Sequence, residues 1–270
     1  MRLSPGSVPI SVVLMCELVP KSIGTFSMDI DAAPFLLVII TGISVIIISL
    51  ALDVLWAQVI PARSFYYMIR APGVIVHECS HILGCLITGA RIKKVVFFSE
   101  KGGSVTYTSS KIPYLGDVVI STAPLLCIPL VLAGCTWVFS QYLGCVFLPL
   151  PLSVGSADAL FGLWAGIMGM FTWNLIVRFN PWFLLYLYLT LTLVMSLAPS
   201  SQDIKNAAIG IGIITLGGIL ILWSSLPLAV AILESITRFI GIGFVFGLMS
   251  GIIALVISSP LLVWYLYRHF

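Results

Sequence analysis

Two of the three histidines in this chain stand four residues apart, with a glutamate between them, in the apolar segment VIVHECSHILGCLITGA (residues 74–90). On a helix, His77 and His81 project from one face, so both imidazoles can bind a single metal ion. Imidazole nitrogen suits Zn²⁺, and a catalytic zinc site uses three protein ligands and a water molecule. Glu78 lies one step round the helix, where it can take a proton from that water. The pattern therefore indicates hydrolysis of a peptide carbonyl at one zinc ion, with Glu78 as the catalytic base.

The surroundings of this motif favour a functional site over a structural one. Ionisable groups inside an apolar run long enough to cross a bilayer are costly and usually mark a site. The alternative is that both histidines lie in the interior of a helical bundle, paired with Glu78. A lone histidine would favour that alternative, whereas the complete His-Glu-x-x-His pattern favours zinc.

The composition is that of an integral membrane protein. Of the 270 residues, 60% are hydrophobic and 9% charged, whereas soluble domains carry about 25% charged residues. Recurring apolar windows of about 20 residues predict an all-α polytopic membrane protein with about seven (six to eight) transmembrane helices. The windows are residues 33–52, 71–90, 116–139, 158–177, 182–198, 207–226 and 240–264. We expect one transmembrane zinc-peptidase domain over residues 31–270, preceded at 1–30 by a tail or an over-called start.

The positive charge is concentrated in one loop. Five of the thirteen basic residues lie between the second and third windows: Arg91, Lys93, Lys94, Lys101 and Lys111. Cytosolic loops of membrane proteins carry such an excess, so we expect this loop, and the nearby histidines, toward the cytosolic side of the cell membrane. The loop is too small for a nucleic-acid interface. The expected partners are the lipid bilayer and a transmembrane protein substrate.

The same loop contains the one convincing β signal. In RIKKVVFFSEKGGSVTYTSS (residues 91–110), β-branched and aromatic residues flank a Glu-Lys-Gly-Gly turn, which predicts a hairpin with strands at about 93–99 and 103–109. A free strand edge can pair with an extended substrate segment. We therefore expect substrate contacts at Val95, Phe97 and Val105.

The order of these features resembles the site-2 protease family of intramembrane zinc metalloproteases. Members carry His-Glu-x-x-His in a membrane helix near the cytosolic face, then a membrane-associated β segment, then a helix that opens with an Ala-Gly-Pro-like element. Here HECSH, GARIKKVVFFSEKGGSV and ISTAPLL follow one another over about residues 70–130. The resemblance implies an intramembrane zinc metalloprotease whose substrate is a transmembrane or membrane-proximal segment.

The third zinc ligand is where the chain departs from this family. The family places an aspartate ligand in a Leu-Asp-Gly motif, which is absent here, and the nearest equivalent is SLAPSSQDIKNA (residues 196–207). We expect Asp203 to be the third ligand. An aspartate after Pro-Ser-Ser is also a good helix N-cap, and it can fill both roles only if its two oxygens divide between metal and backbone. Asp117, at the start of the third window, is the reserve ligand.

A role for Asp203 constrains the topology. If residues 112–152 cross the membrane once and each later window crosses once, Asp203 falls on the opposite side from the zinc. If residues 112–152 cross twice, as a short helical hairpin, Asp203 returns to the cytosolic side. The basic residues are distributed equally well in both cases, so the need for a third ligand favours the second.

The missing Leu-Asp-Gly motif leaves a different class of function open. In that case the chain is a non-catalytic membrane protein, such as a transporter, a scaffold or an inactive homologue, with a metal-binding His-Glu-His cluster.

Overall fold

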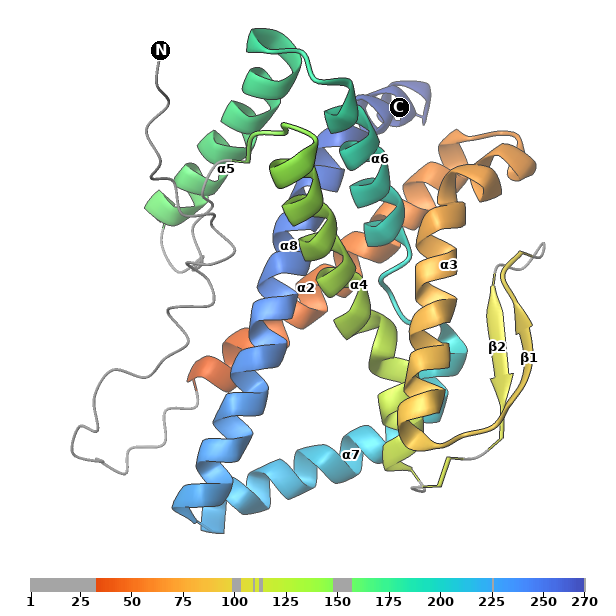
Figure 1. The fold of residues 1–270 in the computed structure, drawn as a ribbon, viewed down its shortest axis with the longest axis vertical. Helices are drawn as coiled ribbons and strands as arrows, with labels where there is room; N and C mark the ends of the chain where they lie inside the picture. The colour runs from red at the N-terminus through yellow and green to blue at the C-terminus, as the bar shows by residue number, and fades with distance from the viewer. Residues whose placement is uncertain are drawn as a thin grey trace.

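The protein is described from a computed structural model, which covers residues 33–98, 103–108, 110–111, 114–147, 157–224 and 226–269. The predicted N-terminal tail at 1–30 lies outside these residues. The fold is mostly helical with one small antiparallel sheet, as predicted (Figure 1). In chain order the elements are α2 (Ala33–Val59), α3 (Arg63–Thr88), β1 (Ile92–Val96), β2 (Ser104–Tyr107), α4 (Leu115–Tyr142), α5 (Ala157–Phe171), the π-helix η1 (Thr172–Val177), α6 (Pro181–Met195), α7 (Ser201–Ser224) and α8 (Pro227–His269).

Five of the described helices are long and apolar enough to cross a membrane, namely α2, α3, α4, α7 and α8. The chain is therefore a multi-pass integral membrane protein. The predicted count of six to eight crossings is not confirmed, because two predicted windows form shorter helices, Phe161–Val177 and Pro181–Met195. A helix of 15 residues such as α6 rises only about 22 Å, less than the roughly 30 Å of a hydrocarbon core.

Of residues 112–152 the structure describes 114–147, and these do not form the helical hairpin that was predicted to return Asp203 to the cytosolic side. They contain one continuous helix of 28 residues, α4, which runs through Pro124 and Pro129. The chain instead returns toward the histidines along α6, which packs against α3 and ends at Met195. A helix that stops short of membrane length thus delivers the next segment to the side of α3.

Helix α3 is the centre of the arrangement because it packs against both α4 and α6. A Cβ atom on Gly73 would lie 2.0 Å from the carbonyl oxygen of Thr192 in α6, and one on Gly84 would lie 2.8 Å from Cα of Ile120 in α4. Small residues of this kind let membrane helices approach closely. The two glycines bracket the histidine motif on either side.

The hairpin predicted near residues 93–109 is confirmed. β1 and β2 pair antiparallel with Val95 opposite Val105; of the expected Glu-Lys-Gly-Gly turn (residues 100–103), only Gly103 is among the described residues. Ile92, Val105 and Tyr107 pack on a small buried cluster of Cys85, Ala90 and Ile120. The hairpin is therefore held against α3 and the start of α4, as Figure 1 shows beside the α3 ribbon.

The contact at Gly73 predicts a sharp difference between two glycine-to-alanine variants. Gly73→Ala should lower stability by about 1–3 kcal/mol through overpacking against the α6 backbone. Gly134→Ala is the matched control in α4, because nothing lies within 4 Å of its Cβ position and alanine is the better helix former by about 1 kcal/mol. Thermal melts of the detergent-purified variants would measure this. Equal melting temperatures for the two would contradict the close approach of α3 and α6.

Candidate metal centre

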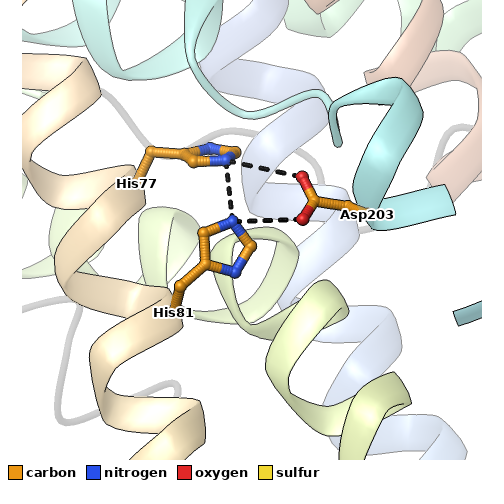
Figure 2. Close-up of side chains that lie close together, drawn as sticks. All are labelled: His77, His81 and Asp203. Atoms are coloured by element: carbon orange, nitrogen blue, oxygen red, sulfur yellow. Dashed lines mark hydrogen bonds and ion pairs between the residues drawn. The ribbon is translucent and has the colours of Figure 1, made fainter. Parts of the chain in front are cut away.

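The two motif histidines and Asp203 converge at one point, although they come from helices far apart in the sequence (Figure 2). The Nε2 atoms of His77 and His81 are 3.1 Å apart. Asp203 Oδ1 lies 3.5 Å from Nε2 of His81, and Oδ2 lies 3.9 Å from Nε2 of His77. One ligand atom from each residue can be chosen so that all lie within 4.8 Å of one another.

The second nitrogen of each imidazole is held by a carbonyl of a neighbouring helix or segment. Nδ1 of His77 is 2.5 Å from the Ser196 carbonyl oxygen, just after α6. Nδ1 of His81 is 2.8 Å from the Ile120 carbonyl oxygen in α4. A carbonyl only accepts, so Nδ1 carries the proton in both rings and Nε2 keeps its lone pair. Metal-binding histidines are commonly oriented in this way.

Asp203 is bonded to Ser200, the residue just before α7, through its Oδ2 atom and its backbone N–H. Oδ2 accepts from the backbone N–H of Ser200 at 2.9 Å and from its hydroxyl at 2.6 Å, while the N–H of Asp203 donates back to the Ser200 hydroxyl at 3.2 Å. This reciprocal pair is a capping box with aspartate at its third position. The N-cap interpretation of Asp203 is therefore wrong in detail: Asp203 is the third residue of α7, and Ser200, which precedes the first helical residue, caps the helix because its hydroxyl oxygen accepts from the Asp203 N–H.

The segment between α6 and α7 is anchored before it reaches Asp203. The Ala198 N–H donates to Oγ of Ser49 in α2 at 2.9 Å, and Ser49 is completely buried. Together with the bond from His77 to Ser196, this fixes the segment at two points. The position of Asp203 thus depends on α2 and α3 as well as on its own helix.

Glu78 lies beside this cluster and is only 5% exposed. It is close enough to interact electrostatically with His81 and Asp203. A Cβ atom on Gly103, the residue before β2, would lie 2.6 Å from both Cγ and Oε1 of Glu78. The start of β2 therefore rests directly on the Glu78 side chain, and only glycine fits there without displacing it.

The other predicted site residues are not part of the group formed by His77, His81 and Asp203. Asp117 is in the first turn of α4 and is not part of the His77, His81 and Asp203 group. Val95 and Val105 face each other in the hairpin, and Phe97 is half-buried at the bend after β1.

The hairpin is also tied to the helix that carries Asp203. Nδ2 of Asn206, one turn along α7 from Asp203, lies 3.4 Å from the Tyr107 hydroxyl in β2. Burial raises the pKa of that hydroxyl above its usual value, so it stays protonated.

The contacts that sequence analysis missed join residues that are far apart in the chain. The Ser196 and Ile120 carbonyls carry no residue-type signal, whereas the Ser200-x-x-Asp203 spacing is a recognisable capping pattern.

Fold and site together define a multi-pass membrane protein with a His-His-Asp group in its helical bundle. The family model of Peptidase M50B-like proteins matches residues 45–206. The chain belongs to this family, which is the site-2 protease family, as the sequence motifs predicted. Searches of curated proteins and of solved structures found no match.

The donor set fits a zinc ion of the catalytic kind. Such sites combine histidine nitrogens with a carboxylate oxygen as three protein ligands and keep a fourth position for water. Two oriented imidazoles and one carboxylate oxygen within 4.8 Å meet that requirement. A structural zinc site would need a fourth protein ligand, and no further His, Cys, Asp or Glu of the described residues joins the group.

Substitution of the two aspartates should separate ligand from bystander. Asp203→Ala should weaken zinc binding by more than the roughly 10- to 100-fold that loss of a ligand's hydrogen-bond partner costs. Asp203→Asn should rescue poorly, since a neutral amide is a weaker ligand, although its carbonyl oxygen can still accept from Ser200. Asp117→Ala is the matched control and should leave the affinity unchanged. Chelator competition on purified protein would measure this, and a zinc-replete Asp203→Ala protein would exclude the ligand role.

Proposed function

We propose that this chain is an intramembrane zinc metalloprotease that hydrolyses peptide bonds of membrane-embedded or membrane-proximal substrates. The observation that carries the proposal is the convergence of His77, His81 and Asp203 within 4.8 Å. Two of these residues lie in a helix of membrane length, and the family is one of peptidases. Charged or ionisable groups placed so deep in a bundle usually serve a reaction or a transport path.

The chain's own residues would divide the chemistry among them. When bound, zinc polarises a carbonyl oxygen and acidifies water. His77, His81 and Asp203 hold the ion, with the rings oriented through the Ser196 and Ile120 carbonyls. Glu78 takes the proton of the attacking water and passes it to the leaving amine nitrogen. Its near-complete burial keeps bulk water from competing for that proton.

The hairpin would present the substrate. A helical substrate must unwind before its carbonyl can be attacked, and an unwound segment can pair with a strand edge. The described sheet has two strands, so each strand has an unpaired backbone edge. Gly103 at the start of β2 touches Glu78, which places this end of the hairpin next to the proposed base. Val95, Phe97 and Val105 would contribute the side chains nearest to a bound segment.

The proposed location is the cell membrane, with the site toward the cytosolic side. Arg91, Lys93, Lys94 and Lys111 are exposed around the hairpin. Basic residues at the end of a membrane helix favour the cytosolic side. His81 is seven residues from the end of α3 at Thr88, or about 10 Å of helix at 1.5 Å per residue, so the site would lie within the bilayer but near that face.

Replacing the proposed base should separate chemistry from metal binding. Glu78→Gln should abolish cleavage while one zinc ion per chain stays bound, because glutamine is similar in size but cannot accept the proton. Cleavage of a transmembrane model substrate and zinc content would be measured on the same preparation. Full activity in the variant would exclude this mechanism. A wild-type chain that binds zinc but cleaves no membrane substrate would favour the non-catalytic alternative of a transporter, scaffold or inactive homologue.

Proline in the hairpin should impair substrate presentation more than metal binding. Val105→Pro removes a backbone donor from β2, and we expect a clear loss of cleavage with little loss of zinc. Val105→Ala is the control, since it shortens the side chain but keeps the N–H. If Val105→Pro cleaves as fast as Val105→Ala, substrate does not pair with this hairpin.

A further inference from the structure

We propose that Ser200 is a positioning residue for the third zinc ligand, holding Asp203 so that Oδ1 is the oxygen presented to the ion. The inference rests on the proposed function, because it deepens the role of Asp203 in that site. Ser200 lies outside the bundle core and is exposed, so its contribution is not packing.

Ser200 and Asp203 donate hydrogen bonds to each other, and those that reach the carboxylate all go to one of its two oxygens. Both donors of Ser200, its N–H and its hydroxyl, go to Oδ2, at 2.9 and 2.6 Å. The length of the hydroxyl bond is that of a charge-assisted bond to an ionised carboxylate. The Asp203 N–H then donates to the Ser200 oxygen at 3.2 Å. The side chain is thereby fixed through two separate atoms of Ser200.

The remaining oxygen of the carboxylate points at the histidines. Oδ1 lies 3.5 Å from Nε2 of His81, whereas Oδ2 lies 3.9 Å from Nε2 of His77. Two acceptor positions of Oδ2 are occupied by Ser200, whereas Oδ1 has the shorter of the two distances to a histidine nitrogen. Asp203 is therefore held so that Oδ1 would be the oxygen that binds the zinc ion.

This arrangement lies in SLAPSSQDIKNA (residues 196–207), the nearest equivalent in this chain to the family's Leu-Asp-Gly motif. Partners that orient a metal ligand normally contribute about 10- to 100-fold to metal affinity. Here the partner, Ser200, is the capping residue of the helix that carries the ligand Asp203. The same hydrogen bonds therefore form the first turn of α7 and orient the carboxylate. The segment between α6 and α7, which leads to Ser200, is itself held by the hydrogen bond from the Ala198 N–H to Ser49.

Four variants separate orientation from helix capping. Ser200→Ala removes both the cap and the hydroxyl bond, whereas Ser200→Gly removes the hydroxyl but caps nearly as well as serine. Ser200→Thr keeps the hydroxyl. Ser201→Ala makes the same chemical change one residue later and is the control. We expect zinc affinity to fall about 10- to 100-fold in both Ser200→Ala and Ser200→Gly, and to stay within a few-fold of wild type in Ser200→Thr and Ser201→Ala.

The measurement is zinc affinity by chelator competition on the full chain in detergent, with the absorption spectrum of the Co²⁺-loaded protein as a second readout of ligand geometry. Wild-type affinity and spectrum in Ser200→Gly would overturn the inference, since the cap alone would then suffice. The proposed function fails separately: if Asp203→Ala also binds zinc normally, Asp203 is no ligand and the ligand set itself is wrong. If Asp203→Ala loses zinc while Ser200→Gly keeps it, only the role of Ser200 is lost.

Discussion

The close approach of α3 to the helices on either side of its histidines is the contact on which the site depends. Gly73 brings α3 against α6, and Gly84 brings it against α4. Each approach sets a carbonyl at hydrogen-bonding distance from an imidazole, that of Ser196 for His77 and that of Ile120 for the second histidine. The rings are thus oriented by neighbouring segments and not by their own helix, so any rotation of α3 would release one of them.

The non-helical segment between α6 and α7 carries a free-energy cost, because its backbone polar groups are not bonded within a helix. Non-helical backbone inside a membrane bundle is tolerated only where the protein or a water-filled cavity satisfies its polar groups. Here the Ser196 carbonyl accepts from His77, the Ala198 N–H donates to Ser49, and the Ser200 N–H donates to Asp203. Two of these three bonds involve proposed ligands. The contacts that make the break tolerable therefore also orient the site.

The hairpin belongs to the same unit. Its second strand follows directly after Gly103, which packs against Glu78, and ends with Tyr107 beside Asn206 of α7. One short strand therefore touches both the proposed base and the helix that carries the third ligand. A segment bound along it would lie next to both, which is why the hairpin and the site are best understood as one structure.

Local patterns in the sequence were enough to predict a mostly helical, multi-pass membrane protein, the hairpin and the His77-Glu78-His81 motif, because each depends on residues that are close neighbours along the chain; the predicted number of membrane helices is not confirmed by the described residues. Only the tertiary structure decided that Asp203, and not Asp117, lies beside the histidines. It also decided that α4 is one helix and not a hairpin. These outcomes depend on packing between distant segments, since 119 residues separate His77 from the Ser196 carbonyl that orients it. Neither periodicity nor residue type encodes where a short helix such as α6 will end against α3.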